Sequence, residues 1–144
     1  MTRYLIDTNT FSELSRPVPS RAVVGWMSGI PDPDLFIATI TIAEIWRGIL
    51  QRPDSRGRRE LQAWFSGPTG PQSLFFGRIL PFDQSAAMRW AQLMAEGFAA
   101  GRPRSPIDMI IAATAAANDC VVVTANERHF EGVVAFLNPL RIAP

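Results

Sequence analysis

Four polar side chains stand at positions where carboxylate chemistry could be carried out. Asp7 follows a short apolar run near the N-terminus, and Asn126 follows another such run near the C-terminus. Glu44 and Asp108 each lie in the first turn of a predicted helix. Clustered carboxylates repel one another, and a divalent cation such as Mg2+ or Mn2+ relieves this repulsion because it prefers oxygen ligands. An ion held in this way can activate water and stabilise charge on a phosphoryl group, so a phosphodiester is the expected substrate.

Each of the three acids also has a purely structural interpretation. Thr41 and Glu44 have the spacing of a capping box, in which Thr41 begins a helix. Ser105 is a typical residue before a helix, and Asp108 in the first turn favours the helix dipole. Asp7 fits an Asx turn that ends a strand. The combination favours function, because Asp7 ends a buried strand and Asp108 opens an apolar helix, which aims their carboxylates at one cleft.

The composition excludes several kinds of catalytic site. All 14 basic residues are arginine, so no lysine can serve a phosphate-binding loop, a Schiff base or a Ser-Lys pair. One histidine and one cysteine are too few for a zinc site built from these residues. Cys120 precedes a valine run and is expected to be a buried thiol. Carboxylates must carry most of any chemistry, and the net charge of +1 argues neither for nor against a nucleic-acid partner.

The elements that must position these side chains alternate along the chain. Apolar runs predict strands at residues 4–6, 35–40, 77–82, 120–124 and 133–137. Helical spacing and capping residues predict helices at residues 20–27, 41–51, 54–65, 84–100 and 105–118. This alternation favours an α/β fold with a parallel sheet, because parallel strands need crossover connections that cover both faces. Ligands of such sheets bind beyond the carboxyl ends of the strands, where these polar residues are expected to meet.

Length and hydropathy set the organisation of the chain. Its 144 residues, 47% of them hydrophobic, are enough for one core, so we expect a single domain over residues 1–144. No apolar run approaches the roughly 20 residues of a membrane span, and the N-terminus lacks the pattern of a secretory signal. We therefore expect a cytoplasmic protein with no membrane partner.

Several segments, taken in order, resemble the PIN-domain ribonucleases and are most similar to the VapC/FitB-type toxins of bacterial toxin–antitoxin pairs. They are "LIDTN" at 5–9, "TIAEIWRGI" at 41–49, "GRILPFD" at 77–83, "AGRPRSPIDMIIAATA" at 100–115, "VVTANERHF" at 122–130 and "FLNP" at 136–139. The resemblance implies a three-layer α/β/α sandwich around a parallel sheet of about five strands. It also implies a magnesium- or manganese-dependent endoribonuclease in which Asp7, Glu44 and Asp108 bind the metal.

The resemblance assigns roles to three further residues. Asn126 falls where many family members have a fourth aspartate, so it is grouped with the three acids as catalytic. Thr124 matches a serine or threonine that often accompanies this position. Asn9 matches an amide that contacts the metal ligands without binding the metal itself. Asparagine contributes no charge, which weakens the binding of a second metal, and the neighbouring Glu127 could compensate.

His129 is a departure from the family pattern, because relatives often carry an aspartate there. We expect a surface histidine that packs on Phe130, with a role in acid–base catalysis as the alternative.

The resemblance also implies partners. Arg102 and Arg104 stand just before Asp108, and arginine suits phosphate contacts, so we expect them to bind the RNA substrate. A cognate antitoxin protein would fill an apolar groove, and another surface would form a homodimer or a larger toxin–antitoxin assembly. The aromatic residues that could exceed the needs of one small core are Trp46, Trp64, Phe65, Phe75 and Phe76.

Two other functions are weighed against this one. Phosphoaspartyl enzymes, such as haloacid-dehalogenase-like phosphatases and response-regulator receivers, also place an aspartate after a strand. The former expect a second aspartate where Asn9 stands, and both use a lysine that this chain lacks. A catalytically weakened PIN-like module that binds RNA or regulates is the other alternative. The neutral Asn126 keeps it open, and the three intact acids argue against it.

Overall fold

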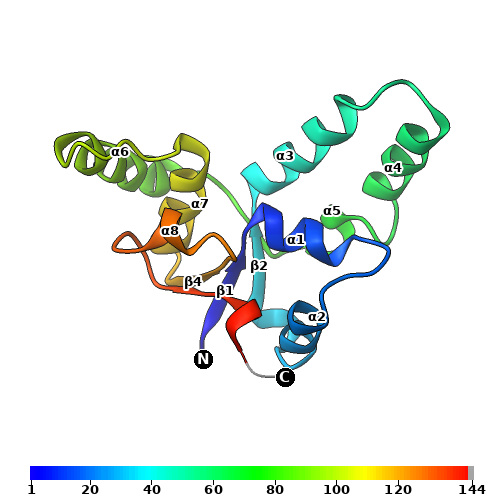
Figure 1. Cartoon of the computed structure of the whole chain (residues 1–144), viewed down its shortest axis with the longest axis horizontal. Helices are drawn as coiled ribbons and strands as arrows, with labels where there is room; N and C mark the ends of the chain where they lie inside the picture. Colours follow the sequence, from blue (N-terminus) through cyan, green and yellow to red (C-terminus); the bar gives the residue numbers. More distant parts are fainter. Residues whose placement is uncertain (143–144) are drawn as a thin grey trace.

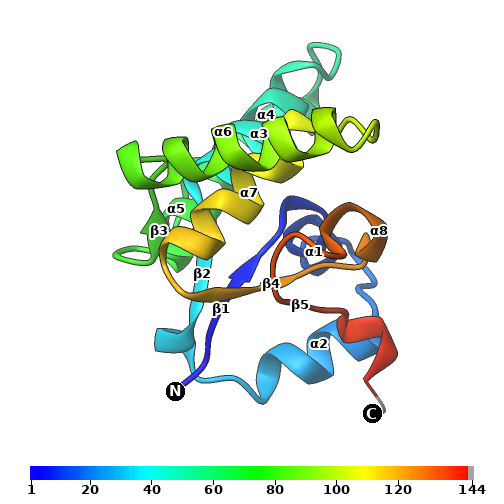
Figure 2. The same ribbon diagram turned by 90° about the vertical axis from the view of Figure 1, so that its left-hand side faces the viewer.

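The computed structural model describes residues 1–142 and contains a five-stranded parallel sheet with helices on both sides (Figures 1 and 2). The strand order is β3-β2-β1-β4-β5. The strands are β1 (Arg3–Ile6), β2 (Leu35–Ala38), β3 (Ile79–Leu80), β4 (Cys120–Val123) and β5 (Phe136–Leu137). The predicted α/β/α sandwich with about five parallel strands is therefore confirmed.

The helices agree with the predicted ones to within a few residues at each end, and three short helices were not predicted. The predicted helices are α2 (Arg21–Ser28), α3 (Thr39–Leu50), α4 (Arg56–Ser66), α6 (Gln84–Ala99) and α7 (Pro106–Ala117). The additional ones are α1 (Thr8–Leu14), α5 (Pro71–Leu74) and α8 (Glu127–Phe130). None of the helices within residues 1–142 has both the length and the apolar character needed to cross a membrane.

Four strands are shorter than predicted, and the strand expected at 120–124 ends only one residue early, at Val123. The strand expected at 35–40 ends at Ala38, because Thr39 already begins α3. The strand expected at 77–82 keeps only two residues, since Pro81 has no N–H for a ladder bond. The strand expected at 133–137 begins at Phe136, because the N–H groups of Val133 and Val134 donate to the carbonyl of Phe130 in a turn.

Alternation along the strands divides the core into two halves. Leu5 packs under α6 and α7 with Met109, whereas Ile6 packs on the opposite face with Phe11 of α1. Figure 2 shows α6 and α7 on one side of the sheet and α2 on the other. Side chains that alternate in this way are expected when both faces of a parallel sheet are buried. Cys120 belongs to the first half and is a buried free thiol, as predicted.

The direction in which the chain winds reverses at β1. From β1 the chain passes to β2 and β3 on one side, and β4 and β5 are added on the other. β1 and β4 pair in parallel, with Ile6 opposite Val123 at their carboxyl ends. In open α/β sheets, ligands bind outside the carboxyl ends of the strands at such a reversal. The residues that follow β1 and β4 are Asp7 and Thr124.

Candidate active site

Asp7 ends β1 and begins α1. Its backbone N–H donates to the carbonyl of Val123 over 3.1 Å, which continues the pairing of β1 with β4. Its Oδ1 accepts from the N–H of Thr10 over 2.8 Å and caps α1, where the sequence indicated only an Asx turn. The residue is 4% exposed, and the neighbouring hydroxyl of Thr124 lowers its pKa. Asp7 is thus fixed at the carboxyl end of β1, where the direction in which the chain winds reverses.

The environment of Asp7 favours the neutral carboxyl group. Desolvation by burial raises the pKa of Asp7 above its ordinary value, and the negative charge of Asp108 raises it further. Hydrogen bonds from Thr10 and Thr124 lower the pKa and only partly offset the burial. Asp108 therefore lies close enough for its charge to act on Asp7, which brings together two acids that are far apart in the sequence.

Asp108 lies in the first turn of α7, as predicted, and it contacts a residue that the sequence did not assign to it. Ser105 caps α7 by accepting a hydrogen bond from the N–H of Asp108 over 3.3 Å. The Oδ2 atom of Asp108 lies 2.6 Å from Nδ1 of His129. His129 is a surface residue, as predicted, with 46% of its side chain exposed, and its contact with Asp108 is one that the sequence did not indicate.

Glu44 is held by hydroxyl groups that the sequence analysis did not identify. Thr8 Oγ1 donates to Glu44 Oε1 over 2.6 Å and lies 3.0 Å from Thr41 Oγ1. Thr41 is buried inside α3 and does not cap it, because α3 begins two residues earlier, at Thr39. Glu44 is therefore in the second turn, and the capping box is not formed. Since Thr8 directly follows Asp7, this contact links Glu44 to the end of β1.

Thr124 directly follows β4 and Asn126 precedes α8, whereas Asn9 and Glu127 face elsewhere. Thr124 Oγ1 accepts from the N–H of Asn126 over 3.0 Å, so the hydroxyl that lowers the pKa of Asp7 also fixes the start of α8. Asn9 is exposed and lines a separate cavity of about 320 Å³. Glu127 pairs with Arg141 at 2.8 Å. The carboxylate that could have compensated for Asn126 is thus engaged with another side chain.

The chemistry of these donors fits a hard divalent cation. Carboxylate oxygens are the ligands that Mg2+ and Mn2+ prefer, and a cation beside Asp7 would offset both the burial and the repulsion from Asp108. Within residues 1–142, no group of three or more histidine, cysteine, aspartate or glutamate side chains is close enough together to hold an ion. The structure therefore gathers the pair Asp7 and Asp108, and Glu44 is joined to them through Thr8.

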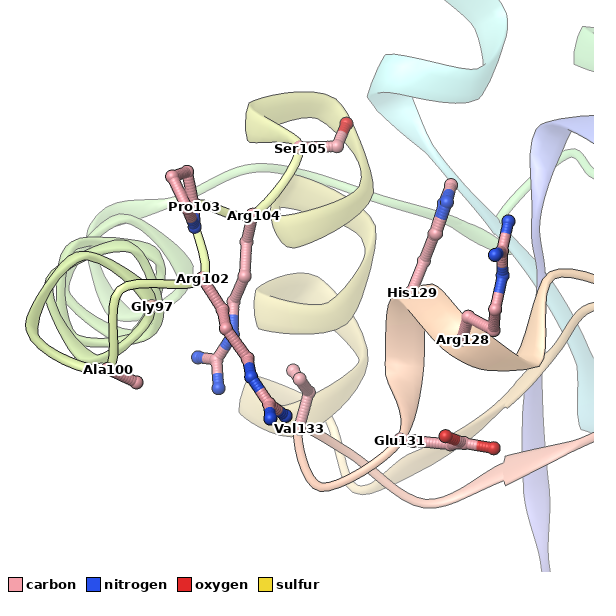
Figure 3. Close-up of a pocket in the computed structure, with 10 residues that line it drawn as sticks. All are labelled: Gly97, Ala100, Arg102, Pro103, Arg104, Ser105, Arg128, His129, Glu131 and Val133. Atoms are coloured by element: carbon pink, nitrogen blue, oxygen red, sulfur yellow. The ribbon is translucent and has the colours of Figure 1, made fainter.

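Two cavities border this site. Thr8 and Glu44 line a groove of about 350 Å³ together with apolar side chains of α1, α3 and α4. His129 lines a second cavity of about 460 Å³, which also contains Arg102 and Arg104 (Figure 3). Glu44 lines the first cavity, and His129, which contacts Asp108, lines the second.

Known proteins resemble this chain over nearly its whole length. A family model described as PIN domain matches residues 4–134. The chain is 35% identical to a VapC ribonuclease of Sinorhizobium fredii and 34% identical to the toxin FitB of Neisseria gonorrhoeae. Each alignment covers 94% of this chain and 96% of the relative. The crystal structure of FitAcB from Neisseria gonorrhoeae matches with a TM-score of 0.88 at 32% identity, covering 96% of this chain and 99% of that one.

Proposed function

Because this chain belongs to the PIN domain family, as its motifs predicted, we propose that it is the toxin of a toxin–antitoxin pair and cleaves RNA as an endoribonuclease. The observation that carries this proposal is the buried Asp7 directly beyond the carboxyl ends of β1 and β4, with Asp108 near enough for its charge to raise the pKa of Asp7. Sheets of this kind bind their ligands at that edge. The names of the VapC ribonuclease and of the toxin FitB support both parts of the proposal.

A Mg2+ or Mn2+ ion is part of the proposal, with Asp7 and Asp108 as ligands and with Glu44, held by Thr8, as a nearby acid. When bound, such an ion supplies positive charge for the phosphodiester oxygens and for the activation of water. The buried carboxylate of Asp7 is the fixed member of this set, since the N–H of Thr10 donates to its Oδ1 over 2.8 Å. Asp108 and Glu44 are partly exposed, with side-chain exposures of 24% and 20%, so both can reach a substrate.

The chain's own residues would orient the reacting groups. His129 holds Oδ2 of Asp108, and Thr8 holds Oε1 of Glu44, so each acid has one oxygen in a short hydrogen bond. Oriented carboxylates bind cations better than mobile ones, because their partners fix the direction of the remaining lone pairs. Asn126 can accept from or donate to a water through its amide, although it adds no charge.

The proposed antitoxin would bind in the groove between α1, α3 and α4. Apolar walls are provided by Phe11, Ile45, Leu61 and Trp64, and Glu44 lies at the edge. An apolar segment of the antitoxin seated there would lie against Glu44 and so would cover the site as it binds. Phe65 and Phe75 are buried and are not available for partners, contrary to the prediction of a surplus. The homodimer remains a prediction, for which the exposed Phe76 and Phe98 are the candidates.

A catalytically weakened module that binds RNA is the second candidate function. The neutral Asn126 favours it, as does the lack of a three-acid group within residues 1–142. One experiment separates the two: purified protein is incubated with total RNA in Mg2+, Mn2+ or chelator, and the ends produced are mapped. The ribonuclease proposal expects metal-dependent cleavage that is lost in Asp7→Asn. Binding without cleavage in either metal would favour the second candidate.

A further inference from the structure

The second cavity, of about 460 Å³, has a strongly positive lining. It lies between the end of α6, the loop before α7, and α8 with the turn that follows it (Figure 3). Its charged side chains are Arg102, Arg104, Arg128 and Glu131, with His129 beside them. The lining therefore contains three guanidinium groups and one carboxylate. Its volume lies within the range of roughly 300–1,000 Å³ that is typical of ligand sites.

Arg104 is committed to holding the fold. Its Nη1 donates to the carbonyl of Leu93 over 2.7 Å and lies 3.4 Å from Oε2 of Glu96, both in α6. The loop packs so closely on α6 that a Cβ at Gly97 would lie 2.9 Å from the carbonyl oxygen of Arg102 and from Cγ of Arg104. The guanidinium of Arg104 thus donates to a helix carbonyl and is held in place by this contact, so it is not free to move toward a ligand.

Arg102 and Arg128 are in the opposite situation. Both are exposed, and within residues 1–142 neither guanidinium group makes a hydrogen bond or an ion pair. The backbone of Arg102 is nevertheless anchored, since its N–H donates to the carbonyl of Gly97 over 2.9 Å. A free guanidinium on a fixed backbone is well suited to bind a phosphate through two hydrogen bonds.

The cavity adjoins the candidate active site at His129. This side chain lines the cavity and contacts Oδ2 of Asp108 at 2.6 Å. In Figure 3, Arg128 and His129 extend together from α8, whereas Arg102 and Arg104 extend from the loop in the opposite direction, toward Val133. An anion in this cavity would therefore lie close to Asp108.

We infer that this cavity binds the RNA substrate through Arg102 and Arg128. These two side chains would contact backbone phosphates adjacent to the phosphate at which the RNA is cleaved. The inference rests on the proposed ribonuclease function and deepens it. It keeps Arg102 in the role expected from the sequence, adds Arg128, and gives Arg104 the structural role of holding the loop on α6.

The test measures RNA binding separately from cleavage. A short single-stranded RNA is titrated with Asp7→Asn protein at several salt concentrations, and with wild-type protein in chelator as a second background. Arg102→Gln and Arg128→Gln should each weaken binding at low salt by several-fold. Each should also reduce the slope of log affinity against log salt by about 0.7, the value for one phosphate contact on a single strand. The control is Arg21→Gln on α2, an exposed arginine outside this cavity, which should bind RNA like the parent.

The outcomes separate this inference from the proposed function. Arg104→Gln should lower the melting temperature and leave the salt slope unchanged. Wild-type slopes in both Arg102→Gln and Arg128→Gln, in a protein that still cleaves RNA, would overturn the phosphate site alone. An equal loss in Arg21→Gln would also overturn it, because binding would then depend only on total charge. A wild-type protein that neither binds nor cleaves RNA in Mg2+ or Mn2+ would overturn both proposals.

Discussion

Asp108 and His129 are joined by a contact of 2.6 Å between Oδ2 and Nδ1, although 21 positions separate them in the sequence. The contact ties the first turn of α7 to α8, and both elements lie at the edge of the sheet where Asp7 ends β1. One oxygen of Asp108 is thereby held in place. The other oxygen makes no hydrogen bond within residues 1–142 and is the one that we expect to bind the metal.

Removing the His129 side chain should weaken metal binding. His129→Ala is expected to lower both Mn2+ affinity and RNA cleavage by roughly 10–100-fold, the usual cost of losing a partner that orients a metal ligand. His129→Gln keeps a donor and should recover part of the loss. Mn2+ affinity is measured by calorimetry without RNA. Wild-type affinity in His129→Ala would show that the contact does not orient a ligand.

The hydroxyl of Thr8 should be needed for the position of Glu44. Thr8→Val keeps the shape of the side chain but removes the donor to Oε1 of Glu44. We expect a loss of about 1–2 kcal/mol in the free energy of unfolding, since a hydrogen bond to a charged group is lost, together with reduced cleavage. Thr8→Ser keeps the donor and is the matched control. Urea denaturation measures the first effect, and equal stability of the two variants would count against this role.

Neutralising Asp7 should stabilise the metal-free protein at neutral pH. Burial raises the pKa of Asp7 in the folded state above its value in the unfolded chain. The stability that this residue contributes is therefore present at pH values below the unfolded pKa, and it is lost as the pH rises through the folded pKa. Asp7→Asn removes this loss and keeps an acceptor for the cap of α1. In chelator, its melting temperature should exceed that of the wild type at pH 7, with the difference shrinking toward acidic pH.

A large side chain in the groove should block the antitoxin and spare the fold. Gly48 lines the groove on α3, and a Cβ there would meet nothing within 4 Å. Gly48→Arg should reduce binding of the protein encoded beside this chain by roughly tenfold or more, while RNA cleavage remains. Gly25→Arg on α2, where a Cβ is equally free, is the control. If both variants bind that partner equally well, the groove is not its site.

Much of the fold could be predicted because its signals are local. Apolar runs located β1 and β4, and a cap with a following apolar pattern located α7. The helix α1 was not predicted, because Asp7, Thr8 and Asn9 are all typical turn residues. Only the structure shows that Asp7 caps a helix. The spacing between Thr41 and Glu44 predicts that Thr41 caps α3. This prediction is wrong, because α3 begins at Thr39 and the hydroxyl of Thr41 contacts that of Thr8.

The candidate site was predicted in part, and the missing part consists of long-range contacts. A strand-end aspartate is visible in the sequence, so Asp7 could be singled out. The partners of the other two acids could not, because the Thr8–Glu44 contact spans 36 positions and depends on how α3 leaves the sheet. His129 lies on a helix of four residues, too short to leave a periodic pattern.

The most direct test of the account is a titration of Mn2+ into the metal-free protein, with Asp7→Asn and Asp108→Asn measured alongside and melting curves to confirm that each variant is folded. We predict that the wild type binds Mn2+ and gains thermal stability from it, because the ion binds the folded state. Each substitution should weaken binding by about 100-fold or more, beyond the 10–100-fold cost of losing a supporting residue. Folded variants that bind Mn2+ as tightly as the wild type, or a wild type that binds none at millimolar concentration, would contradict the claim that Asp7 and Asp108 share one cation.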